Sequence, residues 1–143
     1  MATYNKFNQF TNDLCIARHN FSTGVYKIML LNTAPSITAQ TRADVASTEL
    51  ATGAGYTSGG ATVTVTVASS SGVAKVSGAN IVFTASGGSI GPFQYAVLYN
   101  ATSGTTSQQY LISWFDYGSA ITLAATETLT VVFDAVNGIL QIS

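Results

Sequence analysis

The hydrophobic positions near the start of the chain recur with the period of an α-helix. Between residues 4 and 18 the apolar side chains are spaced three and four apart, and they form one stripe made of Tyr4, Phe7, Phe10, Leu14 and Ala17. This spacing predicts an amphipathic helix over residues 4–18, with Thr3 as its N-cap. The helix can pack on its own chain or on a neighbouring subunit, and packing on its own chain is the favoured alternative.

The pattern changes to that of β-strands after the first two dozen residues. A continuous apolar run over residues 25–31 predicts a strand buried on both faces. Residues 42–51 are expected to form a short helix or an irregular loop, and the glycine-rich stretch 53–60 a linker or tight turn. From residue 61 to residue 67 valine and threonine alternate, which predicts a half-buried antiparallel strand.

The rest of the chain consists of short apolar runs separated by turn residues. A turn at 69–72 is followed by expected strands near 73–77, 79–85, 93–100, 109–116, 119–124, 127–134 and 138–142. The dipeptide Asn137-Gly138 is the strongest local hairpin signal. This spacing predicts a mainly β fold, an antiparallel β-sandwich or jelly-roll-like module with one N-terminal amphipathic α-helix. We expect a single domain over 1–143, divided into an N-terminal helical arm (1–22) and a β-sandwich body (24–143).

The surface of this module must be nearly uncharged. Only 8% of the residues are charged and the net charge is -1, whereas an ordinary soluble domain has about 25% charged residues. Such a surface suits burial between subunits, and the alternative is a robust monomer with a neutral surface. The Lys and Arg residues are scattered, which argues against nucleic acid as a partner. The chain shows neither a secretion signal nor an apolar run long enough for a membrane span. We therefore expect synthesis in the cytoplasm, and the single Cys15 fits a reducing compartment.

Few residues are candidates for chemistry. Cys15 and His19 stand four positions apart and could share a helix face, but a zinc site needs four ligands. We expect Cys15 to be a small buried residue and His19 to complement the dipole at the C-terminus of the helix. Residues 87–92 lack the lysine and the helix of a phosphate-binding loop. We expect no catalytic, metal-binding or cofactor-binding residues, and no enzyme activity.

One acidic residue stands among aromatic side chains. Asp116 is flanked by Trp114, Phe115 and Tyr117, but the sequence marks no second carboxylate that would complete a glycosidase pair. A sugar-binding surface patch made of Tyr110, Trp114 and Tyr117 is one interpretation of these rings. The other is that the rings fill the core or an assembly interface.

Several segments together resemble a known family. They are 1–10, 31–35, 53–60, 83–93, 95–100, 114–119 and 133–135. With these segments the chain resembles a family of small virion structural proteins of tailed bacteriophages, and the resemblance covers nearly the whole chain. It implies assembly into a particle after synthesis in the host cytoplasm, and it brings no catalytic residues.

Three positions in a virion are compatible with this resemblance. The first is a capsid decoration protein, forming trimers and binding the phage major capsid protein. The second is a tail, neck or collar component, and the third is a host-surface glycan-binding module on a fibre. The candidate assembly-interface residues are those of the helix stripe, Tyr4, Phe7, Phe10 and Leu14. The uncharged alternation in 61–67 further predicts self-association, because long strand edges without charges invite pairing.

Overall fold

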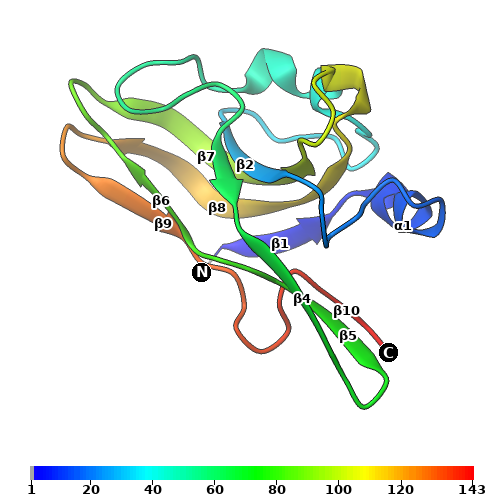
Figure 1. Ribbon diagram of the computed structural model, residues 1–143. Helices are drawn as coiled ribbons and strands as arrows, with labels where there is room; N and C mark the ends of the chain where they lie inside the picture. The colour runs from blue at the N-terminus through cyan, green and yellow to red at the C-terminus, as the bar shows by residue number, and fades with distance from the viewer. Residues whose placement is uncertain (1) are drawn as a thin grey trace.

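The predicted mainly β, antiparallel architecture with one N-terminal helix is confirmed. The computed structural model describes residues 2–143 and shows an arrangement of packed sheets consistent with a β-sandwich (Figure 1). Within these residues the strands are β1 (Thr3–Lys6), β2 (Tyr26–Leu31), β3 (Ala61–Val63), β4 (Val65–Ser70), β5 (Val73–Gly78), β6 (Ile81–Thr84), β7 (Ile90–Asn100), β8 (Leu111–Leu123), β9 (Thr128–Val131) and β10 (Leu140–Ile142). The helix α1 spans Asn8–Cys15, and short 3-10 turns lie at η1 (Arg42–Asp44), η2 (Ala46–Thr48) and η3 (Thr106–Gln108).

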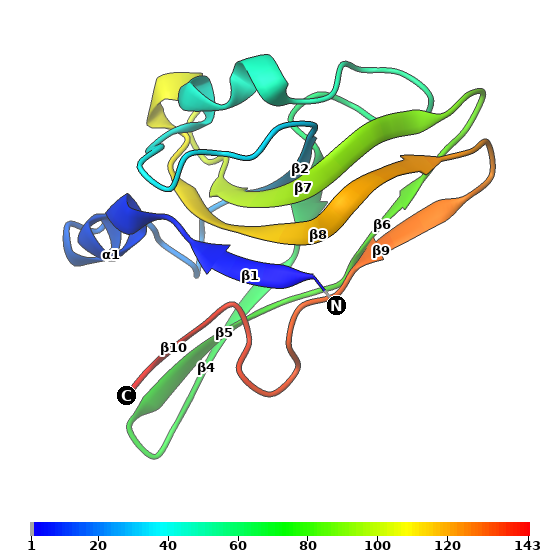
Figure 2. The same cartoon turned by 180° about the vertical axis from the view of Figure 1, so that it is seen from behind.

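The main sheet has the strand order β1-β8-β7-β2-β3, with antiparallel neighbours throughout. Strand β2, which lies between β7 and β3, is the predicted apolar run, and five of its six residues are buried. Side chains on one face of the sheet join a large core with Phe10, Tyr56, Phe83 and Phe133. Side chains on the other face pack under the segment between β2 and β3, in a smaller core that contains Val45. The main sheet is therefore covered on both sides, as Figures 1 and 2 show.

Two smaller sheets complete the fold. Strands β6 and β9 pair with each other, and β4, β5 and β10 form a sheet in the order β10-β5-β4. The β4–β5 hairpin projects away from the main sheet (Figure 1). Its turn at 69–72 was predicted, and the φ angles of Ser71 (51°) and Gly72 (82°) are both positive, as a tight hairpin turn requires.

The N-terminal prediction is wrong in its boundaries. Residues 3–6 form strand β1, in which Tyr4 lies opposite Phe115 of β8, and the helix begins only at Asn8. Thr3 is therefore not the N-cap; that position belongs to Phe7, whose backbone is extended. Pairing along the edge of β8 satisfies the backbone of residues 3–6, which overrides the helical spacing of their side chains. Residues 3–6 are a strand of the main sheet, and residues 7–15 pack against that sheet, so this segment does not form a separate arm.

The favoured packing of the helix on its own chain is confirmed. Phe7 and Phe10 are almost fully buried, Phe7 in the smaller core and Phe10 in the larger one. Of the four candidate interface residues, these two offer no surface to a partner in this conformation. Tyr4 is 47% exposed and Leu14 is partly buried, so these two retain accessible area.

Three further strand predictions need correction. The alternating segment 61–67 is divided at Thr64 into β3 and β4, which belong to different sheets, and Val67 is exposed instead of buried. Gly118 does not separate two strands, because β8 continues through it. Residues 117–120 form a β-bulge, in which four residues of β8 lie opposite the single residue Gln94 of β7. Asn137-Gly138 does not close a hairpin, since β10 pairs with β5 and not with β9.

Candidate functional site

Cys15 and His19 do not form a joint site. Cys15, the last residue of α1, is exposed, and this contradicts the predicted burial. His19 lies beyond the helix and is buried, with its ring 5.1 Å from that of Phe10 and stacked on Phe21 at 5.9 Å. Burial lowers the pKa of His19 to about 4, and the nearby Asp13 carboxylate only partly opposes this. His19 is thus neutral near pH 7, so it does not complement the helix dipole as predicted.

Asp116 is held as a hydrogen-bond acceptor on the surface of β8. Its Oδ1 atom accepts hydrogen bonds from Gln94 Nε2 at 2.9 Å and from the Gly118 amide at 2.7 Å. These bonds lower the pKa of Asp116, the Gln94 bond having the larger effect. The carboxylate is therefore ionised near neutral pH, and its local role is to order the bulge in β8.

The three aromatic residues of the suggested sugar patch have different surroundings. Trp114 is buried, with its ring 4.6 Å from the ring of Phe7. Tyr110 is partly buried, and the guanidinium of Arg18 lies over its ring, with 4.5 Å between Arg18 Cζ and the ring centre. Tyr117 is partly buried further along β8, at the bulge. Trp114 thus fills the core and does not present a flat ring to a sugar.

A buried ion pair between Arg42 and Glu49 is a site that the sequence analysis missed. The Arg42 Nη2 atom lies 2.7 Å from Glu49 Oε2, and the Glu49 side chain is 3% exposed. Glu49 Oε1 also accepts hydrogen bonds from the Tyr56 hydroxyl at 3.0 Å and from the Gly59 amide. Tyr99 donates to the Gly59 carbonyl at 2.7 Å, and burial raises the pKa of Tyr99 to about 12. This network fastens the segment between β2 and β3 to the main sheet.

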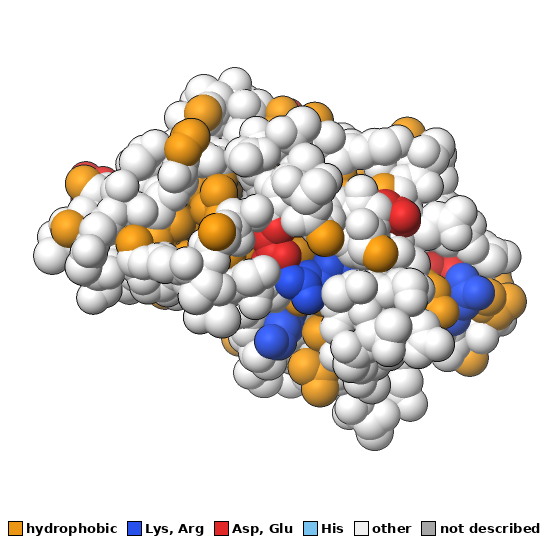
Figure 3. All heavy atoms as spheres, turned by 90° about the horizontal axis from the view of Figure 1, so that it is seen from above, with side chains coloured by type: hydrophobic (Ala, Val, Ile, Leu, Met, Phe, Trp, Pro, Cys, Tyr) orange, Lys and Arg blue, Asp and Glu red, His pale blue; other side chains and the backbone are white. Residues whose placement is uncertain are grey.

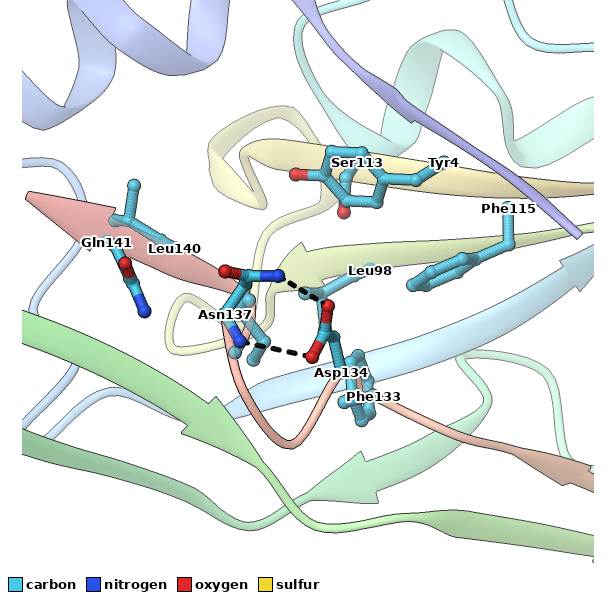
Figure 4. A pocket seen from close by; sticks show the side chains of 11 residues that line it. Tyr4, Leu98, Ser113, Phe115, Phe133, Asp134, Asn137, Leu140 and Gln141 are labelled. Atoms are coloured by element: carbon cyan, nitrogen blue, oxygen red, sulfur yellow. Dashed lines mark hydrogen bonds between the residues drawn. The ribbon is translucent and has the colours of Figure 1, made fainter.

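A cavity of about 400 Å³, partly open to solvent, lies between the main sheet and the C-terminal segment. Figure 4 shows its walls. The sheet contributes Tyr4 from β1, Leu98 from β7, and Ser113 and Phe115 from β8. The opposite wall is formed by residues 133–134 and 137–141.

The second wall of this cavity is ordered by its own hydrogen bonds. Asp134 Oδ1 accepts a hydrogen bond from the Val136 amide at 2.7 Å. It also accepts one from the Asn137 amide at 3.0 Å, and Asp134 Oδ2 accepts one from Asn137 Nδ2 at 2.7 Å; Figure 4 shows these two bonds to Asn137. These bonds lower the pKa of Asp134, those from Asn137 having the largest effect. Strand β10 follows this turn and pairs with β5. The cavity is therefore bounded by a sheet on one side and a hydrogen-bonded turn on the other.

The lining is mainly apolar, with one polar atom deep in the wall. Ser113 is fully buried, and its Oγ atom has no hydrogen-bond partner among residues 2–143. Burial raises the pKa of Tyr4, and the nearby Ser113 hydroxyl partly opposes this, although the two groups do not reach hydrogen-bond geometry. Neither the cavity nor this serine was singled out by the sequence.

The outer surface is poor in charge. Figure 3 shows a face on which uncharged polar groups and backbone predominate, with scattered hydrophobic side chains and few charged ones. The most exposed large apolar side chains are Val136, Val132, Val82, Ile142 and Ile16, and Val67 is also about half exposed. Within the described residues there is no group of three or more His, Cys, Asp or Glu side chains placed to hold a metal ion. None of the helices found in 2–143 is long and apolar enough to cross a membrane.

No protein-family model, no curated protein and no solved structure matches the chain.

Proposed function

We propose that the chain is a structural subunit of a tailed-bacteriophage virion, and that it decorates the outer surface of the head. The observation that carries the proposal is the free edge of β4. This strand is hydrogen-bonded to β5 on one side, and no strand within 2–143 pairs with its other side. Its sequence, Val-Thr-Val-Ala-Ser-Ser, contains no charge and no proline.

Such an edge is suited to pairing with another chain. Monomeric β-proteins protect their edge strands with lysine, proline, bulges or covering loops. In β4 five of six residues are exposed, including Val67 at 49%. The β4–β5 hairpin also projects beyond the main sheet, so its backbone is accessible to a neighbouring subunit (Figures 1 and 2).

The low charge supports the same function. A net charge of -1 over 143 residues gives little electrostatic repulsion between copies packed closely on a particle. The resemblance of nearly the whole sequence to small virion structural proteins supports the same conclusion. His19 packs against aromatic rings, and Asp116 accepts hydrogen bonds from Gln94 and Gly118. Neither residue contacts a nucleophile in the contacts described above, and both stabilise the local fold.

The test is to locate and count the chain in purified virions of the phage that encodes it. Quantitative mass spectrometry and a particle map by electron cryomicroscopy give both results. A decoration protein covers the head in many copies, whereas a neck or tail component forms a closed ring with few copies. A low copy number on the tail would overturn the head position, and absence from the particle would overturn the virion function altogether.

A further inference from the structure

We propose that the cavity between the main sheet and residues 133–141 binds a small neutral amphiphile with an apolar body and one hydroxyl or amide group. The inference does not depend on the virion function. It rests on three features of the cavity: its size, its apolar walls, and the unpartnered hydroxyl of Ser113.

The size fits a small organic molecule. A cavity of about 400 Å³ falls in the range of about 300–1,000 Å³ typical of ligand sites. A dry apolar cavity of about 150 Å³ can hold benzene, so this one has room for roughly fifteen non-hydrogen atoms. The apolar wall groups, among them Leu98, Phe115, Phe133 and Leu140, would gain from contact with a hydrocarbon body.

The Ser113 hydroxyl defines the polar end of the ligand. Ser113 is one of the residues that line the cavity; its side chain is fully buried, and its Oγ atom has no hydrogen-bond partner within the described part of the chain. Buried polar groups in folded proteins are nearly always hydrogen-bonded. Figure 4 shows this side chain beside the ring of Tyr4, on the wall opposite Asn137. A hydroxyl or amide of a ligand in the cavity would supply the missing partner.

The charges around the cavity favour a neutral ligand. The carboxylate of Asp134 is part of the lining, and it would repel an anion. Lys75 donates to the backbone carbonyls of Ala135 and Val136, at 3.3 and 3.5 Å, and does not line the cavity. A cation would have to leave water for an apolar cavity, while both Asp134 oxygens already accept hydrogen bonds.

Binding of para-phenylphenol to the full chain tests the proposal, with para-phenylbenzoate as the charged analogue. Calorimetry should show one site for the phenol and affinity at least about tenfold weaker for the benzoate. Ser113→Ala should weaken phenol binding about fivefold, because one hydrogen bond is lost. Ser119→Ala, an exposed serine on the same strand, is the matched control and should leave binding unchanged.

Two filling variants locate the site. Ser113→Leu places a larger side chain in the cavity from the sheet, and Leu140→Trp does so from the opposite wall, so that one variant remains informative if the other does not fold. Each folded variant should lose phenol binding, and in the original chain the phenol should shift the methyl NMR signals of Leu98, Ile139 and Leu140.

Any of three results would overturn the proposal: no binding of the phenol, binding that survives both filling variants, or shifts centred elsewhere on the molecule. A virion protein segment found in the cavity instead of a small molecule would also overturn it, as would a cavity that holds only water in the presence of the phenol.

Discussion

Arg42 and Glu49 form a nearly buried ion pair, with 2.7 Å between Nη2 and Oε2. Through Glu49 the pair is linked to Tyr56, whose hydroxyl also accepts a hydrogen bond from the backbone amide of Leu30 in β2 at 3.1 Å. The segment between β2 and β3 has little regular structure of its own beyond two short 3-10 turns. Its position over the main sheet therefore depends on this network and on the small core beneath it.

The first prediction concerns this network. Glu49→Gln leaves the Arg42 guanidinium largely buried without its counter-charge, and we expect the free energy of unfolding to fall by about 3 kcal/mol. Urea unfolding followed by circular dichroism measures this. Arg42→Met alone and the double variant Arg42→Met/Glu49→Gln are the controls, because removing both charges should cost less than the sum of the two single changes. Additive effects would show that the two residues do not act as a pair.

The second prediction concerns the close approach of Gly60 to β2. Gly60 has a φ of +72°, and a Cβ atom there would overlap the carbonyl of Ile28. Gly60→Ala should therefore lower the free energy of unfolding by about 3 kcal/mol or more. Gly72 has a similar φ of +82° with nothing within 4 Å of its Cβ position, so Gly72→Ala should cost only about 1 kcal/mol. Equal losses in the two variants would refute the overlap.

The fold class could be predicted from the sequence because most strands have a local signal. The apolar run that became β2 and the turn at 69–72 depend on neighbouring residues alone. Strand β1 depends on residues far away, since Thr3 pairs with Asp116. Tyr4 and Phe7 are three positions apart in the sequence, a spacing that also fits a helix. The apolar pattern therefore could not reveal that residues 3–6 pair with β8.

The candidate site was less accessible to sequence analysis. Ser113 lies in an apolar run and has the pattern of an ordinary strand residue, and only the meeting of three strands with the C-terminal segment places it in a cavity wall. Arg42 and Glu49 are seven positions apart in an irregular segment, where no regular periodicity brings side chains together. In both cases the site is made by tertiary packing and not by a motif.

The third prediction is a loss of stability in mild acid caused by His19. Its pKa is about 6.5 in an unfolded chain but about 4 in the folded one, because burial disfavours the charged ring. The unfolded state therefore binds more protons between these values, and stability is full above pH 6.5 and falls as the pH drops toward 4. Between pH 7.5 and 4.5 this contribution amounts to about 2 kcal/mol.

Urea unfolding of the original chain and of His19→Phe at both pH values isolates this contribution. Asp13 and Arg18, the charged groups that act on His19, remain in both proteins. Phenylalanine retains a ring that can stack on Phe21 but cannot take up a proton. We expect the loss of stability in acid to be about 2 kcal/mol smaller in the variant. The same loss in both proteins would show that His19 does not cause it.

The last prediction tests the free edge of β4. If this uncharged edge pairs with a second copy, the chain should self-associate at micromolar concentration in analytical ultracentrifugation. Val67→Lys introduces a charge in the middle of the strand, which should weaken association at least about tenfold, because pairing would bury the ammonium group or bring two of them together. Val136→Lys makes the same change at a 75% exposed position in the loop before β10 and should leave association unchanged. If the chain is monomeric at high micromolar concentration, or if the two lysine variants have equal effects, β4 is not the edge through which copies associate.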